Sequence, residues 1–263
     1  MKRWLLSGLT FRDLVKSLQI FDKISGDYHK YRQPKRLVVK RLQALITEFG
    51  NQSSIVLDIG CGTGSYLNEL KSIEPINKVG MDLSLNMLNQ GRSLKKESLL
   101  VQADFNASFP FGDKSFDLII AVDCLHFAKD LSLTLKEVHR VLKRNGGFIV
   151  ALHTPEDIRR QTLSKYFPQA ELFDLQEANR LTLLCDIANS LGLKFMRAYN
   201  EIEEFIPEIS FIEIFEKKCA SVLNKINPED FYIGLKDIKF DFYNGTLIGI
   251  ESHTIYVLEL RNG

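Results

Sequence analysis

Three glycines follow a short apolar run in the stretch VLDIGCGTG, residues 56–64. Glycine lets the main chain turn sharply and approach a ligand without a Cβ in the way. A helix that begins after Gly64 presents unpaired N–H groups and a positive dipole end, which favour an anionic ligand group. The spacing departs from the dinucleotide pattern G-x-G-x-x-G, whose third glycine would replace Ser65. No G-x-x-x-x-G-K-[ST] loop is present, which excludes a nucleoside-triphosphate loop of that kind.

Four aspartates accompany this loop. Asp58 stands two residues before the first glycine, whereas Asp82, Asp104 and Asp123 each close or follow a later apolar run. In an open parallel sheet, ligands bind beyond the carboxyl ends of the strands, at the switch point in strand order. The positions of the aspartates therefore predict a polar, ligand-binding edge of such a sheet.

The elements that position these residues alternate between strand and helix. The run IVLDI, residues 55–59, is too short for a helix and too dense for a strand with one buried face, so it indicates a parallel sheet. Helices are expected over 84–91 and 133–143. Further strands are expected over 76–81, 99–103, 116–122 and 147–153. This alternation predicts an α/β fold, a Rossmann-like doubly wound and mostly parallel sheet with helices on both faces.

The second half of the chain is mainly helical. Residues 155–192 and 209–226 are expected to be helical, with a sixth strand within 194–206 and a seventh over 253–260. Because these helices interrupt the sheet, we expect a single domain with helical lid insertions. Its parts are an N-terminal helical cover (1–50), the core (51–153), the lid with late core elements (154–250) and the last strand (251–263).

Composition excludes several classes of protein. The 263 residues are 45% hydrophobic and 25% charged, which is ordinary for a globular chain. A net charge of +1 lacks the excess of positive charge that neutralises a polyphosphate backbone, so nucleic acid is not expected as a partner. The four cysteines are scattered without zinc-ligand spacing, so no metal is expected and a reducing compartment is favoured. The apolar N-terminal start is interpreted as an amphipathic helix, which leaves a cytoplasmic location and no membrane partner.

The motifs together resemble the class I S-adenosylmethionine-dependent methyltransferases, in the small-molecule branch that includes the ubiquinone and menaquinone enzymes. VLDIGCGTG resembles the first motif of that family, and GMDLS resembles its ribose-binding acidic strand end. QADFNASFPFGDKSFDLIIAVDCLHF is similar to the stretch with the adenine-contacting acid and the fourth strand, and LKEVHRVLKRNGGFIVA to the following helix and strand. The resemblance covers residues 55–153.

The resemblance implies S-adenosylmethionine as cofactor and S-adenosylhomocysteine as product. The glycines would approach its methionine and ribose parts, with Asp58 orienting the loop or holding the ammonium. Asp82 would accept from both ribose hydroxyls and Asp104 from the adenine amino group. Residues 21–32 resemble the N-terminal element that covers the cofactor. The implied cofactor-binding residues are Asp58, Gly60, Cys61, Gly62, Gly64, Asp82, Leu83, Met87, Asp104, Phe105, Asp123, Cys124, Leu125, Tyr28 and Arg32.

Methyl transfer from a sulfonium is an in-line displacement whose thioether leaving group needs no protonation, so the protein mainly positions the acceptor. A base is needed only if the acceptor must lose a proton. The candidates are His126 and His153, at carboxyl ends of strands, and Tyr28 or His29 near the N-terminus. For each histidine, capping a helix or packing under the lid is the alternative.

The aromatic residues of the lid favour a small, partly apolar organic acceptor, methylated on O, N or C. Cys124 lacks the preceding proline of cytosine-methylating enzymes, which argues against a nucleophile there. Two other functions stay open, a nicotinamide-dependent oxidoreductase and a non-catalytic scaffold with a methyltransferase fold. The protein is expected to be a monomer or a homodimer.

Overall fold

A computed structural model describes residues 30–49, 54–70, 77–94 and 98–261. Within them, the apolar runs form one seven-stranded sheet in the order β3-β2-β1-β4-β5-β7-β6. The strands are β1 (Ile55–Ile59), β2 (Asn77–Asp82), β3 (Leu99–Gln102), β4 (Phe116–Val122), β5 (Leu142–Leu152), β6 (Leu193–Phe205) and β7 (Gly249–Leu260). The predicted α/β fold with seven strands is confirmed.

The direction of the strands changes at one edge of the sheet. Strands β1 to β5 run parallel, while β7 is antiparallel to both β5 and β6. The chain order reverses between β1 and β4, so the carboxyl ends of these two strands flank the topological switch point. In the β5–β7 register Leu152 pairs with Thr254, which brings a segment close to the C-terminus beside the end of β5.

Each face of the sheet is covered by helices with an apolar stripe. On one face α2 (Arg36–Phe49) and α3 (Ser65–Glu69) bury residues such as Leu42 and Leu67 against β1, β4 and β5. On the other, α5 (Leu131–Val141) and α9 (Leu184–Ser190) bury residues such as Val138 and Ala188. Helix α4 (Leu85–Ser93) packs against β2 and β3 and begins at Ser84, whose hydroxyl accepts from the Met87 N–H.

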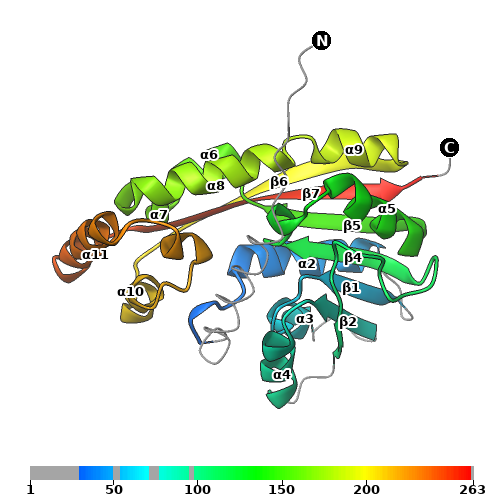
Figure 1. Cartoon of the computed structure of the whole chain (residues 1–263), viewed down its shortest axis with the longest axis horizontal. Coiled ribbons are helices and arrows are strands. Elements are labelled where there is room, and N and C mark those ends of the chain that lie inside the picture. The colour runs from blue at the N-terminus through cyan, green and yellow to red at the C-terminus, as the bar shows by residue number, and fades with distance from the viewer. Residues whose placement is uncertain (1–29, 50–53, 71–76, 95–97, 262–263) are drawn as a thin grey trace, which may run out of the picture.

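The remaining helices lie in the segment predicted to be a lid, and most of them share an apolar cluster of their own. These elements are α6 (Pro155–Arg160), α7 (Thr162–Tyr166), α8 (Pro168–Leu181), α10 (Ile209–Glu216), the short 3-10 helix η3 (Ser221–Asn224) and α11 (Pro228–Tyr243). Phe167, Phe215 and Ile238 are buried in this cluster. Figure 1 shows α10 and α11 at the far end of the long strands β6 and β7, beyond the short parallel strands.

One expected helix of the lid needs correction, and one observed helix was not expected. The helix predicted over 209–226 ends at Glu216, because Lys218 adopts a left-handed conformation with φ 51°, and a separate turn, η3, follows. Helix α11 was not predicted at all, although Asn227 caps it by accepting from the Asp230 N–H and Pro228 occupies its first turn.

The expected N-terminal amphipathic helix lies outside the described residues. None of the helices in the described part of the chain is long and apolar enough to cross a membrane. The cytoplasmic location and the division into cover, core and lid stay predictions.

Candidate active site

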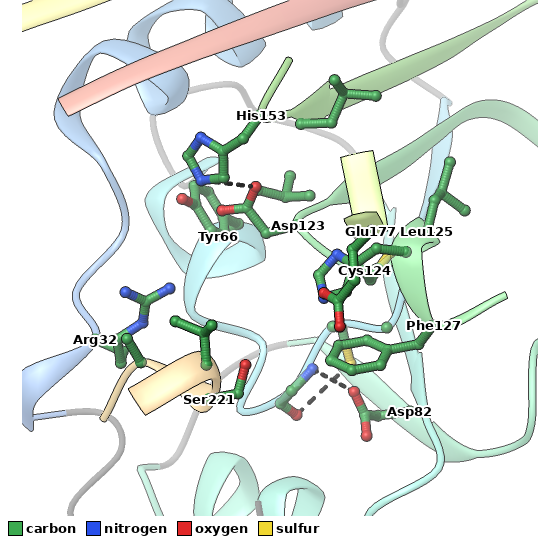
Figure 2. A pocket seen from close by; sticks show the side chains of 18 of the residues that line it. Arg32, Tyr66, Asp82, Asp123, Cys124, Leu125, Phe127, His153, Glu177 and Ser221 are labelled. Atoms are coloured by element: carbon green, nitrogen blue, oxygen red, sulfur yellow. Dashed lines mark hydrogen bonds and ion pairs between the residues drawn. The ribbon is translucent and has the colours of Figure 1, made fainter. Parts of the chain in front are cut away.

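A cavity of about 280 Å³ opens at the carboxyl ends of β1, β2 and β4. The glycine loop, the strand-end aspartates and the lid elements α8 and η3 all contribute to its lining (Figure 2). Most of the predicted site residues meet there. The cavity is lined by Arg32, Asp58, Gly60, Cys61, Gly62, Asp82, Leu83, Met87, Asp104, Phe105, Asp123, Cys124, Leu125, His126 and His153.

The glycine loop needs glycine for both conformation and space. Gly60, Gly62 and Gly64 have φ angles of 67°, 56° and 69°, in the left-handed region. A Cβ on Gly60 would lie 2.6 Å from the Cβ of Cys124. Gly64, which precedes α3, does not line the cavity, so it shapes the turn without facing the ligand space.

Asp82 is fixed to the glycine loop by the main chain. Its Oδ2 accepts from the Gly62 N–H at 2.7 Å and its Oδ1 from the Ser84 N–H at 2.9 Å. Main-chain groups thus position both carboxylate oxygens at the wall of the cavity, which Asp82 lines. The neighbouring Asp58 is buried, and burial, followed by the charge of Asp82, raises its pKa well above the ordinary value.

Asp104 lies across the cavity in a tight turn after β3. Its Oδ1 accepts from the main-chain N–H of Asn106 at 2.8 Å and from the Asn106 side chain at 3.1 Å. Leu83, Met87 and Phe105 line the same cavity and supply apolar surface. This part of the cavity therefore combines apolar walls with carboxylates, as a flat heteroaromatic group with polar edges requires.

Cys124 does not have the properties of a nucleophile. Its thiol is buried and donates to the Ile59 carbonyl at 3.0 Å. Burial, followed by the charge of Asp58, raises the pKa of this thiol well above its ordinary value. The reactive thiolate is therefore disfavoured, in agreement with the argument from the missing proline.

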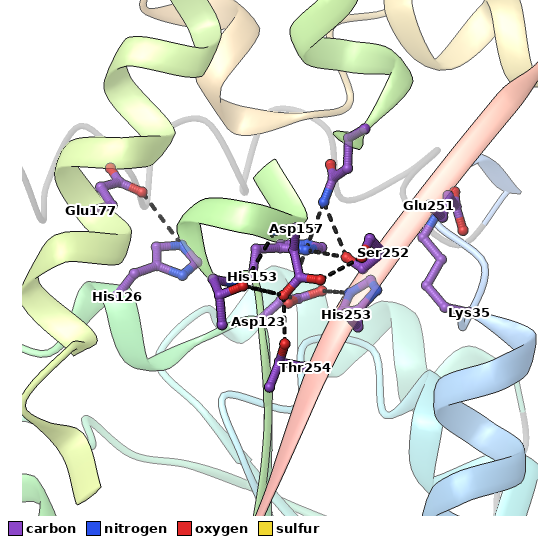
Figure 3. Close-up of polar contacts among 12 residues, drawn as sticks. Lys35, Asp123, His126, His153, Asp157, Glu177, Glu251, Ser252, His253 and Thr254 are labelled. Atoms are coloured by element: carbon purple, nitrogen blue, oxygen red, sulfur yellow. Dashed lines mark hydrogen bonds and ion pairs between the residues drawn. The ribbon is translucent and has the colours of Figure 1, made fainter. Parts of the chain in front are cut away.

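Asp123 lies between two histidines. It has a left-handed φ of 48°, and its Oδ2 is 3.1 Å from Nε2 of His253, while its Oδ1 is 3.5 Å from Nε2 of His153 (Figure 3). Burial favours the neutral form of Asp123, but the two histidines outweigh it, and the pKa of Asp123 is lowered. Burial, then the charge of His253, lowers the pKa of His153 to about 4.

His126 lies beside helix α8 of the predicted lid, apart from the two histidines that contact Asp123. It lies in the 3-10 helix η2 (Leu125–Phe127), with its Nε2 3.9 Å from Oε2 of Glu177 on α8. Burial lowers the pKa of His126 although Glu177 opposes the shift, so the imidazole is neutral and able to accept a proton. One turn before Glu177, burial and then the charge of Glu177 raise the pKa of Asp174 to about 7.

Arg32 lines the cavity as predicted, whereas Tyr28 and His29 lie outside the described residues. Beside Arg32, Lys35 forms an ion pair with Glu251 of β7 (Figure 3). Sequence reasoning missed several lining residues, namely Tyr66, Asn106, Phe127, Gln161, Asp174, Glu177, Ser221 and Val222. It also missed His253, which stands in an alternating apolar strand without any local motif.

Known proteins resemble the core of the chain. Residues 57–150 match the family of methyltransferase domains. Malonyl-[acyl-carrier protein] O-methyltransferase of Legionella pneumophila is 30% identical over 143 residues, which are 53% of this chain and 50% of that protein. Demethylmenaquinone methyltransferase of Lactococcus lactis is 33% identical over 165 residues, 57% of this chain and 64% of that protein. Residues 57–150 are therefore a methyltransferase domain.

Solved structures agree with this methyltransferase fold. Phosphoethanolamine N-methyltransferase 2 of Haemonchus contortus, in complex with S-adenosylhomocysteine, superposes with a TM-score of 0.59 at 20% identity, covering 97% of this chain and 61% of that one. The [4+2]-cyclase SpnF superposes with a TM-score of 0.58 at 17% identity, covering 93% of this chain and 95% of that one. The fold therefore does not by itself fix the reaction.

The segment matched to the methyltransferase family has clear limits. It extends from β1 into β5 and includes the glycine loop, Asp82, Asp104 and Asp123. His153, the lid and His253 lie beyond it. In addition, the matches to the two named relatives span only about half to two-thirds of those proteins. The family assignment thus concerns the cofactor side of the cavity.

Proposed function

We propose that this protein is an S-adenosylmethionine-dependent methyltransferase that methylates an O, N or C atom of a small, partly apolar organic acceptor by in-line displacement. The observation that carries the proposal is the contact between Asp82 and the glycine loop. The Gly62 N–H holds the Asp82 carboxylate at the cavity, where its oxygens accept from a pair of ribose hydroxyls in the proposed complex. The family assignment makes S-adenosylmethionine the ligand to expect there.

The remaining predicted cofactor contacts keep their roles in this proposal. Asp104 accepts from the adenine amino group, and Leu83, Met87 and Phe105 pack against the ring. The buried Asp58 orients the glycine loop, since its raised pKa disfavours a free carboxylate for binding an ammonium group. Arg32 lies where it can reach the carboxylate of the methionine part.

The acceptor binds on the lid side in this proposal. The lining there mixes apolar groups such as Leu163 and Val222 with the polar groups Asp174 and Glu177. His126 is the better placed of the two described candidate bases, because it is neutral and lies 3.9 Å from the Glu177 carboxylate without a hydrogen bond to it. His153 is engaged instead with Asp123, Gln161 and the Ser252 carbonyl.

Calorimetric titration with S-adenosylhomocysteine and, separately, with NAD tests the proposed cofactor. We expect binding of the former only. Asp82→Ala removes a ligand acceptor and a partner of the Gly62 N–H, so it should weaken S-adenosylhomocysteine binding by about 1–3 kcal/mol. The matched control Asp237→Ala alters an exposed aspartate of α11 and should leave the affinity unchanged.

Three results would redirect the proposal. Binding of NAD alone would favour an oxidoreductase. Unchanged affinity in Asp82→Ala would show that the cofactor lies elsewhere. Cofactor binding without transfer of labelled methyl to any of a panel of amines, phenols, carboxylic acids and enolisable ketones would favour a non-catalytic scaffold.

A further inference from the structure

Three potential metal ligands from three strands meet at the inner end of the cavity. Asp123 follows β4, His153 follows β5 and His253 belongs to β7. Each offers one ligand atom, and these atoms lie within 4.8 Å of one another. Figure 3 shows both imidazole rings turned toward the Asp123 carboxylate.

The distances suit a shared cation. Nε2 of His253 is 3.1 Å from Oδ2 of Asp123, and Nε2 of His153 is 3.5 Å from Oδ1. Ligand atoms bonded at about 2.0–2.2 Å to one zinc-like ion lie roughly 3.0–3.5 Å apart. Only small side-chain rotations would therefore bring the three atoms around one ion.

The hydrogen bonds around His153 leave an unsatisfied place between the ring and Asp123. Nδ1 is 2.8 Å from the carbonyl oxygen of Ser252, which can only accept, so the ring proton is on Nδ1. Nε2 then directs its lone pair at Oδ1 of Asp123, a buried oxygen with no hydrogen-bond partner among the described residues. The Gln161 amide nitrogen, 2.7 Å from Nδ1, donates to the same Ser252 carbonyl at 3.3 Å. Two facing electron pairs in a buried place are stabilised by a cation between them.

A second layer of residues holds the two histidines in place. The Asp157 carboxylate accepts from the Thr154 N–H at 2.9 Å, next to His153, and from the hydroxyl of Thr254 at 2.7 Å. It also accepts from the hydroxyl of Ser252. Because side chains alternate along a strand, Ser252 and Thr254 point to Asp157 while His253 between them points to Asp123. Asp157 touches neither ring, but its bonds fix the main chain beside His153 and on both sides of His253.

We propose that Asp123, His153 and His253 bind one divalent transition-metal ion, such as Zn²⁺ or Fe²⁺. Two imidazoles and one carboxylate select such an ion over Mg²⁺ and Ca²⁺, which prefer oxygen ligands. Three protein ligands leave coordination positions open, as in metal sites that also bind a small molecule. Asp123 and His153 line the main cavity, so the open positions face it. No zinc-ligand spacing marks these residues in the sequence, because the three ligands are far apart along the chain.

Binding is tested on the full chain after chelator treatment, with Co²⁺ and Zn²⁺ as probes. Visible absorption reports Co²⁺ binding and its displacement by Zn²⁺, and ¹⁵N spectra of labelled histidines report which rings are involved. We expect a single ion per chain and Nε2 shifts for two of the five histidines. This measurement does not depend on methyl transfer, so it stands or fails separately from the proposed function.

Variants then locate the site. Asp123→Asn, His153→Ala and His253→Gln should each weaken Co²⁺ binding by more than about 100-fold, while Asp157→Asn, in the second layer, should lose about 10–100-fold. His139→Ala, which removes an exposed histidine of α5, is the matched control and should bind like the wild type. Zn²⁺ should raise the melting temperature of the wild type and of His139→Ala but not of the ligand variants.

Some outcomes would overturn the metal site. Absence of stoichiometric binding by the wild type would do so, whether or not the variants fold. A metal-induced ¹⁵N shift for more or fewer than two histidines would also contradict it. So would equal metal affinity in the wild type and in the three ligand variants.

Discussion

The two sides of the cavity are built in different ways. On the cofactor side, main-chain groups hold the side chains: the N–H groups of Gly62 and Ser84 fix Asp82, and that of Asn106 fixes Asp104. On the acceptor side, side chains from distant segments hold one another, as Glu177 and Lys225 do in an ion pair beside His126. The first side is set by local chain conformation, whereas the second depends on how the lid packs. Changes to the chain should therefore separate the two sides.

The largest effect is expected from Gly60→Ala. The new Cβ requires a left-handed alanine, which costs about 1–2 kcal/mol, and it overlaps Cys124, which costs about 1–3 kcal/mol more. The free energy of unfolding, measured in urea, should fall by about 2–5 kcal/mol, and S-adenosylhomocysteine binding should be lost. Gly245→Ala is the matched control, since Gly245 has φ 70° with nothing within 4 Å of the new Cβ. Equal losses in the two variants would contradict the tight contact beneath the loop.

A change within the lid should leave the cofactor side intact. In Gly234→Ala the Cβ would lie 2.3 Å from the carbonyl oxygen of Tyr166. Overpacking costs about 1–3 kcal/mol and the better helix propensity of alanine returns about 1, so a net loss of about 0–2 kcal/mol is expected. Amide exchange should quicken in α10 and α11 while S-adenosylhomocysteine affinity is unchanged. Lys236→Ala, at an exposed position of the same helix, should alter neither quantity. A matching loss of cofactor affinity in Gly234→Ala would show that the two sides are coupled.

The smallest effect concerns the charge of the lid and depends on pH. The pKa of Asp174 is raised to about 7, above the value near 3.9 of an unfolded chain. Its protonated form therefore favours the fold fully below pH 4, and this contribution is lost as the pH rises to about 7. Asp174→Asn should match the wild type near pH 4 and exceed its unfolding free energy by about 1 kcal/mol at pH 8, since partial exposure reduces the effect.

Urea unfolding at several pH values measures the effect of Asp174→Asn. The control Asp237→Asn, at an exposed site, should show no difference that varies with pH. A gain for Asp174→Asn that is already complete at pH 4 would contradict the assigned burial of this carboxyl.

The contrast also explains what the sequence could predict. Asp58, Asp82 and Asp104 each stand at the end of a strand with a recognisable apolar run, so local pattern and the switch-point rule place them together. His253 has no such signal, since its place beside Asp123 depends on β7 running antiparallel to β5 in one register. A one-residue slip would turn it to the other face.

The lid contains one element that the sequence could have predicted and others that it could not. Helix α11 could have been predicted from Asn227 and Pro228, which are a recognisable cap and first turn. The break at Lys218 could not, because no glycine marks its left-handed conformation. The contacts of Asp174 and Glu177 with the cavity follow from the packing of α8 on η2 and η3, which has no counterpart in local sequence pattern.

The position of β7 has a consequence for how the chain is assembled. Among the described strands it is the last to leave the ribosome, yet it lies between β5 and β6. Until it is synthesised, β6 has no neighbouring strand and Asp123 lacks its partner His253. The glycine loop and β1 to β5 can form earlier, because their contacts are shorter in sequence. A nascent chain would thus acquire its cofactor crevice first and bring His253 beside Asp123 only after β7 has been synthesised.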